Sequence, residues 1–165
     1  TFNFTGRRCL IMKAVSLLLL FVITVGGAPQ KSTPPVAVES LAGIGIGTSL
    51  EEAQSKLSRI GTGNGRDTRE GGRKEAWTLA EGDFNTLAFK TNKAGHIVWV
   101  SAFVRPGREV LLAQLGDPAK AATLTKSQAI WNVGLGSSGY RLVAKGAEGK
   151  ASVVYLLSLD SPEVQ

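Results

Sequence analysis

The sequence predicts an α+β protein in which two helices pack on an antiparallel sheet built from two tandem αβββ units. Two observations lead to this fold class. Apolar residues recur at helical spacing in two segments and follow strand-like patterns in six others. The same order of elements then occurs twice along the chain, which is typical of tandem repeats. A length of 165 residues with 43% hydrophobic residues suits one small domain or two very small ones and excludes wholesale disorder.

Residues 12–27 have the plan of a secretory signal peptide. Lys13 gives a positive start, an apolar run covers residues 14–25, and small residues follow up to Gly27. The run is shorter than the roughly 20 residues that a transmembrane helix needs. We expect cleavage near Gly27 and a periplasmic or secreted protein, with an uncleaved anchor as the alternative. Residues 1–11 precede the only Met, and we interpret them as upstream reading frame, with an n-region extended by Arg7 and Arg8 as the alternative.

A polar, proline-rich linker is predicted over residues 28–39, so folded sequence is expected to begin near Ser40. No cysteine lies beside the expected cleavage site, and we therefore expect no lipid anchor.

The cysteine and charge content narrows the function classes. Cys9 is the only cysteine, which excludes an internal disulfide framework and a cysteine-rich zinc site. Without residues 1–27 the chain loses Arg7, Arg8 and Lys13, and its formal charge falls from +6 to +3. This modest charge and the predicted export both argue against a nucleic-acid partner.

The first unit, residues 40–106, is predicted to begin with a helix. Its start has capping-box spacing at Thr48 with Glu51 and at Ser49 with Glu52. Four apolar residues then form one helical stripe that ends before Gly61: Leu50, Ala53, Leu57 and Ile60. The glycine-rich segment 43–47 lacks the spacing and the lysine of a phosphate loop, so no nucleotide cofactor is expected.

A long polar loop and three strands are expected to complete the first unit. Residues 61–74 contain five glycines and no apolar residue, which predicts a functional or disordered loop. Strands follow at residues 76–80, 84–90 and 96–104. The last of these is apolar on both faces, which predicts a central strand that is covered on both sides.

The second unit, residues 107–165, repeats this order. A short helix is predicted at residues 108–115, and strands are predicted at residues 129–133, 140–145 and 151–159. Trp77 and Trp131 lie 54 positions apart, and the same offset relates three further pairs: Gly95 and Gly149, Val100 and Val154, and Phe103 and Leu157. Because neither unit alone could bury a large core, we expect the two to pack together.

Two short motifs carry a resemblance: the helix start Gly47-Thr48-Ser49-Leu50-Glu51-Glu52 and the helix stop Leu115-Gly116-Asp117-Pro118, each before a tryptophan-bearing strand. With them the chain resembles the SmpA/OmlA (BamE-like) outer-membrane-assembly lipoproteins and the tandem-repeat β-lactamase inhibitory proteins of similar layout. The resemblance covers most of residues 43–159 and implies helices packed on antiparallel sheet and protein binding without catalysis. The chain departs from the first group in lacking a lipidated cysteine and from the second in lacking paired cysteines.

No residue pattern predicts catalysis or a metal site. The only histidine, His96, has no cysteine partner and no serine or aspartate arranged with it, so we interpret it as a surface or turn residue. The carboxylates have no paired spacing, and helix capping explains Glu51 and Glu52. We therefore expect no catalytic residue, no metal and no cofactor.

Two aromatic residues are candidates for partner binding. Trp99 and Tyr155 lie on the two long strands and are favoured for an exposed sheet face, since Trp and Tyr are enriched at protein interfaces. The repeated Trp77 and Trp131 are interpreted as core residues.

Four basic residues are further candidates. Arg66, Arg69, Arg73 and Lys74 make the predicted loop basic, which would suit an acidic partner or an anionic lipid surface. The structural alternative is a solvated loop with no binding role.

The sequence therefore predicts an exported, non-catalytic protein-binding module, either an envelope scaffold or an inhibitor. Its expected partner is another envelope or extracellular protein, and a peripheral membrane contact is left open. The alternative is a small ligand-binding or hydrolytic envelope protein whose cleft the sequence does not reveal.

Overall fold

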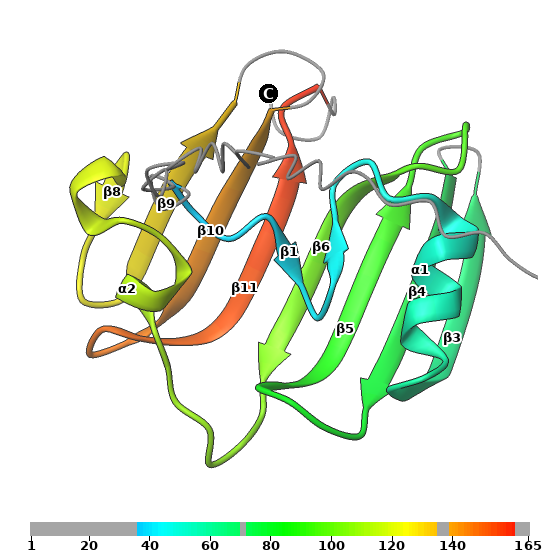
Figure 1. Cartoon of the computed structure of the whole chain (residues 1–165), viewed down its shortest axis with the longest axis horizontal. Helices are drawn as coiled ribbons and strands as arrows, with labels where there is room; N and C mark the ends of the chain where they lie inside the picture. Colours follow the sequence, from blue (N-terminus) through cyan, green and yellow to red (C-terminus); the bar gives the residue numbers. More distant parts are fainter. Residues whose placement is uncertain (1–35, 70–71, 135–138, 161–165) are drawn as a thin grey trace, which may run out of the picture. The chain divides into compact units, whose positions relative to one another are not determined.

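The computed structural model describes residues 36–69, 72–134 and 139–160, and these residues are organised by one antiparallel sheet (Figure 1). Its strands, within the described residues, are β3 (Gly61–Arg69), β4 (Gly72–Leu79), β5 (Phe84–Thr91), β6 (Ile97–Val104), β7 (Val110–Leu111), β8 (Thr123–Leu124), β9 (Gln128–Val133), β10 (Tyr140–Ala147) and β11 (Lys150–Ser158). The strand order is β3-β4-β5-β6-β11-β10-β9-β8, and β7 pairs with β11 off this path.

Several short elements lie over one face of this sheet, which we call the covered face (Figure 1). They are α1 (Leu50–Leu57), the hairpin of β1 (Ser40–Leu41) with β2 (Ile44–Gly45), and α2 (Leu112–Leu115) with the 3-10 turn η1 (Pro118–Lys120). The opposite face is called the open face, because none of the described helices or strands lies over it.

The predicted fold class, α+β with two helices packed on the sheet, is wrong. Of the described residues, 57% lie in strands or bridges and 13% are helical. Half of the helix expected at residues 108–115 is absent, because Val110 and Leu111 form β7 and pair with Ala151 and Lys150 of β11. Only the four residues of α2 remain helical, so the described part of the chain has a single helix of more than one turn.

The first helix is confirmed, with a shorter extent than expected. The Glu52 backbone N–H donates to Ser49 Oγ at 3.2 Å, as the capping-box spacing predicts. Ala53 and Leu57 are buried on the covered face. The helix ends at Leu57 rather than before Gly61, because Gly61 already belongs to β3.

The long loop predicted at residues 61–74 is wrong. Residues Gly61–Arg69 form the edge strand β3, paired with β4 from Gly61 opposite Leu79 to Arg69 opposite Gly72. Apolar periodicity is absent because an edge strand need not bury its own side chains. A Cβ on Gly61 would stand 2.3 Å from the Thr78 carbonyl oxygen, so the glycine allows the two backbones to approach closely.

The six predicted strands are all confirmed, as β4, β5, β6, β9, β10 and β11. The prediction that residues 96–104 form a central strand is right, but coverage on both faces is wrong, since Phe103 in β6 is 47% exposed. β6 pairs with β11 at the centre of the sheet, where Ser101 lies opposite Tyr155. These two residues are 54 positions apart, the offset that also separates Trp77 from Trp131. The division into units 40–106 and 107–165 stays a prediction.

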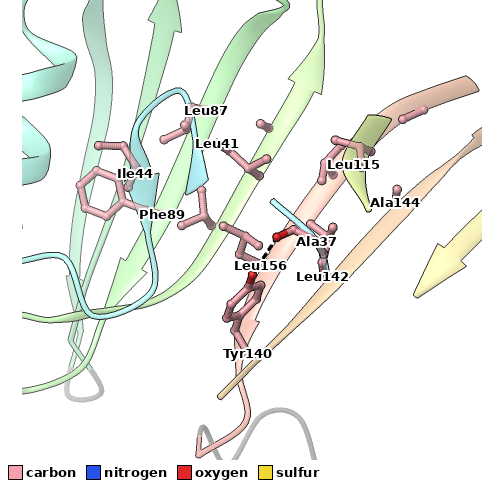
Figure 2. Close-up of a cluster of buried hydrophobic side chains, with 14 of the residues drawn as sticks. Ala37, Leu41, Ile44, Leu87, Phe89, Leu115, Tyr140, Leu142, Ala144 and Leu156 are labelled. Atoms are coloured by element: carbon pink, nitrogen blue, oxygen red, sulfur yellow. Dashed lines mark hydrogen bonds between the residues drawn. The ribbon is translucent and has the colours of Figure 1, made fainter. Parts of the chain in front are cut away.

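The hydrophobic core lies between the sheet and the elements over its covered face (Figure 2). Leu41 and Ile44 of the β1–β2 hairpin are buried together with side chains of β5, β10 and β11: Leu87, Phe89, Leu142, Ala144 and Leu156. Trp77 and Trp131 are also buried, which confirms their interpretation as core residues.

The fold begins before Ser40, so the linker predicted over residues 28–39 overlaps it. Ala37 forms a bridge with Gly116, and the Val38 backbone N–H donates to the Leu115 carbonyl oxygen at 2.8 Å. The Tyr140 hydroxyl donates to the carbonyl oxygen of Ala37 at 3.3 Å, which Figure 2 shows. The predicted signal peptide, residues 1–11 and the rest of the linker lie outside the described residues.

Candidate binding face

The open face is formed by alternate side chains of six neighbouring strands, which the register places in three rows. Across β4, β5, β6, β11, β10 and β9 these rows are Lys74, Lys90, Trp99, Leu157, Arg141 and Asn132, then Ala76, Ala88, Ser101, Tyr155, Val143 and Ile130, then Thr78, Thr86, Phe103, Val153, Lys145 and Gln128. The centre of the face is apolar and aromatic, and its cations lie around that centre.

Three of the sequence-predicted candidates meet on this face. The ring centroids of Trp99 and Tyr155 are 6.5 Å apart, with the planes inclined by 40°. Lys74 Nζ lies 5.5 Å from the centroid of the Trp99 ring, within the range of a cation–π contact. Both aromatic residues are half-buried, so part of each side chain is exposed to solvent. The placement of Trp99 and Tyr155 on an uncovered sheet face agrees with the sequence analysis, and their role in binding stays a prediction.

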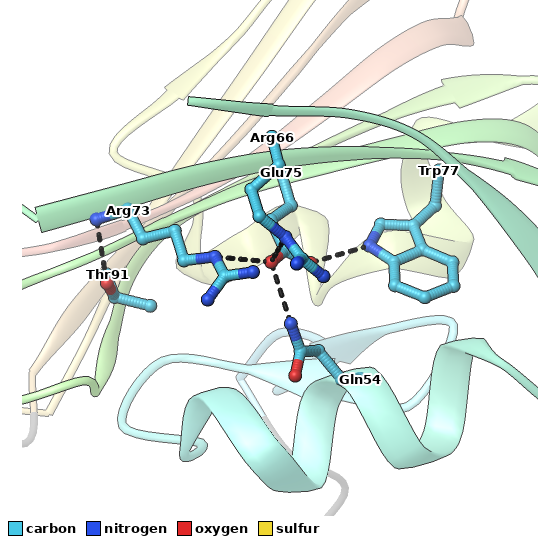
Figure 3. A network of polar contacts seen from close by, with 6 residues as sticks. All are labelled: Gln54, Arg66, Arg73, Glu75, Trp77 and Thr91. Carbon is cyan, nitrogen blue, oxygen red and sulfur yellow. Dashed lines mark hydrogen bonds and ion pairs between the residues drawn. The ribbon is translucent and has the colours of Figure 1, made fainter. Parts of the chain in front are cut away.

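Arg66 and Arg73 lie on the other side of the sheet, around a buried carboxylate (Figure 3). Glu75 is 2% exposed, and its Oε1 is 3.0 Å from Arg66 Nε and 2.6 Å from Arg73 Nε. Gln54 of α1 donates to the same oxygen at 2.7 Å, and Trp77 Nε1 donates to Oε2 at 3.3 Å. We name these five residues the Glu75 cluster. Its arginines neutralise a buried charge, and Gln54 connects α1 to the β3–β4 hairpin through the same carboxylate, so the two arginines have a structural explanation.

Arg69, the remaining candidate, is opposite Gly72 at the end of β3. The six predicted residues are therefore not one site. Lys74 joins the aromatic residues of the open face, whereas Arg66 and Arg73 join the Glu75 cluster, because neighbouring residues of a strand point to opposite faces.

Sequence reasoning missed most of the open face. Phe103, Arg141 and Lys145 were not singled out, although the consecutive apolar positions of β6 and β11 were a usable signal. For residues 96–104 the sequence analysis interprets this pattern as coverage on both sides. It is equally typical of a strand that has one face in the core and an apolar face left open.

A cleft lies away from this face, beside α2 and β8. It has a volume of about 610 Å³, and Leu112, Leu124 and Pro118 make much of its wall apolar. Lys126 and Glu148 are its charged lining residues.

His96 is exposed at the start of β6, as its interpretation as a surface or turn residue requires, and its Nδ1 is 3.3 Å from the Gly47 carbonyl oxygen. Within the described ranges, no three His, Cys, Asp or Glu side chains gather closely enough to hold a metal ion. In the same ranges, none of the helices is both long enough and apolar enough to span a membrane.

Comparisons of the chain with protein-family models, with curated proteins and with solved structures found no match. The resemblance to the BamE-like lipoproteins and to the β-lactamase inhibitory proteins therefore stays a prediction.

Proposed function

We propose that the protein is a non-catalytic protein-binding module that docks a partner on its open face. The observation that carries this proposal is the 47% exposure of Phe103 in a central strand, beside an aromatic pair and several aliphatic residues. An antiparallel sheet with one solvated face normally has polar side chains on that face. Contiguous exposed apolar surface on a soluble protein is typical of an interaction site.

The composition of the open face supports a protein partner. Its middle row has Ser101, Tyr155 and Val143 opposite one another, and Ser101 and Val143 are already buried. Tyr155 and Trp99 are large and have few rotatable bonds, so little conformational entropy is lost when a partner covers them. Residues of this kind dominate the binding energy of protein interfaces.

The proposed location is the periplasm or the exterior of the cell, where the partner would be an envelope or extracellular protein. Support comes from the signal-peptide plan of residues 12–27 and from the absence of cysteine in the rest of the chain after Cys9.

The experiment is an affinity capture with the tagged protein in three forms: unmodified, Phe103→Asp and Leu124→Asp. Each form is purified from cells that express the full sequence. Phe103→Asp places a charge on the open face, at a position exposed enough for the fold to tolerate it. Leu124→Asp is the matched control, because Leu124 is 50% exposed and lies in β8, outside the face. We expect one stoichiometric partner that the Phe103 variant loses and the Leu124 variant keeps. Equal retention by both variants would contradict docking on the open face.

A second candidate function is the binding of a small apolar ligand in the 610 Å³ cleft, which is favoured by its apolar wall. For this function Leu124→Asp is the test variant, because Leu124 lines the cleft, and Phe103→Asp is the control. Loss of binding of a hydrophobic reporter dye by Leu124→Asp alone would favour the ligand-binding alternative.

A further inference from the structure

We propose that the partner of the open face is an acidic protein surface, whose carboxylates meet the cations around the aromatic centre. This inference rests on the proposed function, because it specifies the chemistry of the surface that docks there.

The charges of the open face are strongly one-sided. Its three rows contain Lys74, Lys90, Arg141 and Lys145 and no carboxylate. The nearest acid in register is Asp67, on the edge strand β3 opposite Lys74. Among the described residues, no carboxylate forms an ion pair with Lys74, Arg141 or Lys145.

These cations lie in the two outer rows, beside the apolar centre, and a partner that covers this centre also covers them. Arg141 is next to Leu157, and Lys145 is next to Val153, in the register of β10 with β11. Lys74 is held against the Trp99 ring. A partner that covers Tyr155 therefore removes water from these charged groups as well. Such desolvation is unfavourable unless opposite charges replace the water, so a stable complex needs acidic groups on the partner.

A second copy of this chain is a poor occupant for the same reason. Face-to-face pairing would bring the lysines and arginines of two open faces together, and like charges at close range oppose association.

An anionic membrane also offers negative charge, but the geometry disfavours it. Trp99 and Tyr155 are half-buried in the middle of strands, not at the tips of loops. A surface that inserts into a bilayer needs apolar groups that protrude into the headgroup region. The acidic occupant favoured by the structure is therefore a protein.

The test is a selection from a displayed library of random peptides against the protein as recovered from cells expressing the full sequence. Binders are then measured against three variants. Phe103→Asp tests the face itself, and the combination of Lys74→Glu, Arg141→Glu and Lys145→Glu reverses its charge. The matched control reverses three exposed cations outside the face: Arg59→Glu, Arg108→Glu and Lys126→Glu.

We expect acidic peptides with aromatic or aliphatic residues to be enriched. The open-face charge reversal should weaken their binding by about tenfold or more, whereas the control reversal should weaken it by no more than about twofold. Higher salt concentration should also weaken the binding of these peptides to the unmodified protein. Circular dichroism of each variant confirms that it is folded.

Different contrary outcomes would contradict the acidic partner and the docking face. Binders that need Phe103 but are not acidic, or that tolerate the open-face charge reversal, contradict the acidic partner and leave the docking face intact. A library that yields no Phe103-dependent binder contradicts the docking face itself. Binding to vesicles of anionic lipid that is lost on open-face charge reversal, without acidic peptide binders, overturns the inference in favour of a membrane.

Discussion

Replacement of Glu75 by alanine should destabilise the protein strongly. The carboxylate is 2% exposed and is contacted by Arg66, Arg73, Gln54 and Trp77. Its removal leaves the Gln54 amide and the Trp77 indole N–H without their acceptor, at about 1 to 3 kcal/mol for each group left unsatisfied. Arg73 is mostly buried and loses its counter-ion, whereas Arg66 is 61% exposed and returns to water at little cost.

The expected loss in the free energy of unfolding is therefore about 3 to 5 kcal/mol, in the range found when one partner of a buried ion pair is removed. Urea denaturation of the purified variant measures it, and the melting temperature should fall by about 10 °C.

Glu109→Ala is the matched control, since Glu109 also pairs with a lysine, Lys150, but is 66% exposed. Its cost should stay below about 1 kcal/mol. If Glu75→Ala costs no more than Glu109→Ala, the Glu75 cluster does not hold α1 to the β3–β4 hairpin and the reasoning is refuted.

Burial, with the Glu39 carboxylate second, raises the pKa of Tyr140 to about 12 from 10.0, so unfolding releases a proton above pH 10 and stability falls between pH 10 and 12. The Tyr140→Phe variant should lack this fall, which is at most about 2 to 3 kcal/mol, and equal pH profiles of the two proteins in urea denaturation would refute the prediction. Ser49→Ala should cost about 1 kcal/mol through loss of the α1 cap, measured against Ser55→Ala as an exposed control. A chain that begins at residue 40 should be less stable than one that begins at residue 36 by about 2 to 4 kcal/mol. The shorter chain loses the hydrogen bonds of Val36 and Val38 to the segment around α2. Equal melting temperatures of the two chains would contradict this prediction.

The strands of the sheet could be predicted from the sequence because their signal is local. Tyr140–Ala147 and Lys150–Ser158 are apolar and β-branched runs on either side of a turn, and the glycine there, Gly149, has φ +78°. The cap of α1 was equally local, since Ser49 and Glu52 are three residues apart.

The errors came from elements whose state depends on distant partners. β3 has no apolar pattern and becomes a strand only because β4 provides hydrogen-bonding groups along its whole length. The segment at Val110 has helical spacing, but its pairing with β11 replaces the first turn of the predicted helix. The residues of the open face differ in the same way. Trp99 and Tyr155 could be predicted from the sequence, whereas Arg141 can be placed on this face only from the register of β10 with β11.

The open face has a pattern that the stability of the isolated chain does not require. Trp77, Phe89 and Leu156 already form the core on the covered face, and α1 with the β1–β2 hairpin shields it. Polar side chains opposite them would complete a stable half-solvated sheet. The chain instead has Trp99 and Phe103 there, with lysines beside them. Exposed aromatic surface promotes association, and the cations beside it favour negative charge. The partner that we propose, an apolar surface with carboxylates at its margin, would match both features.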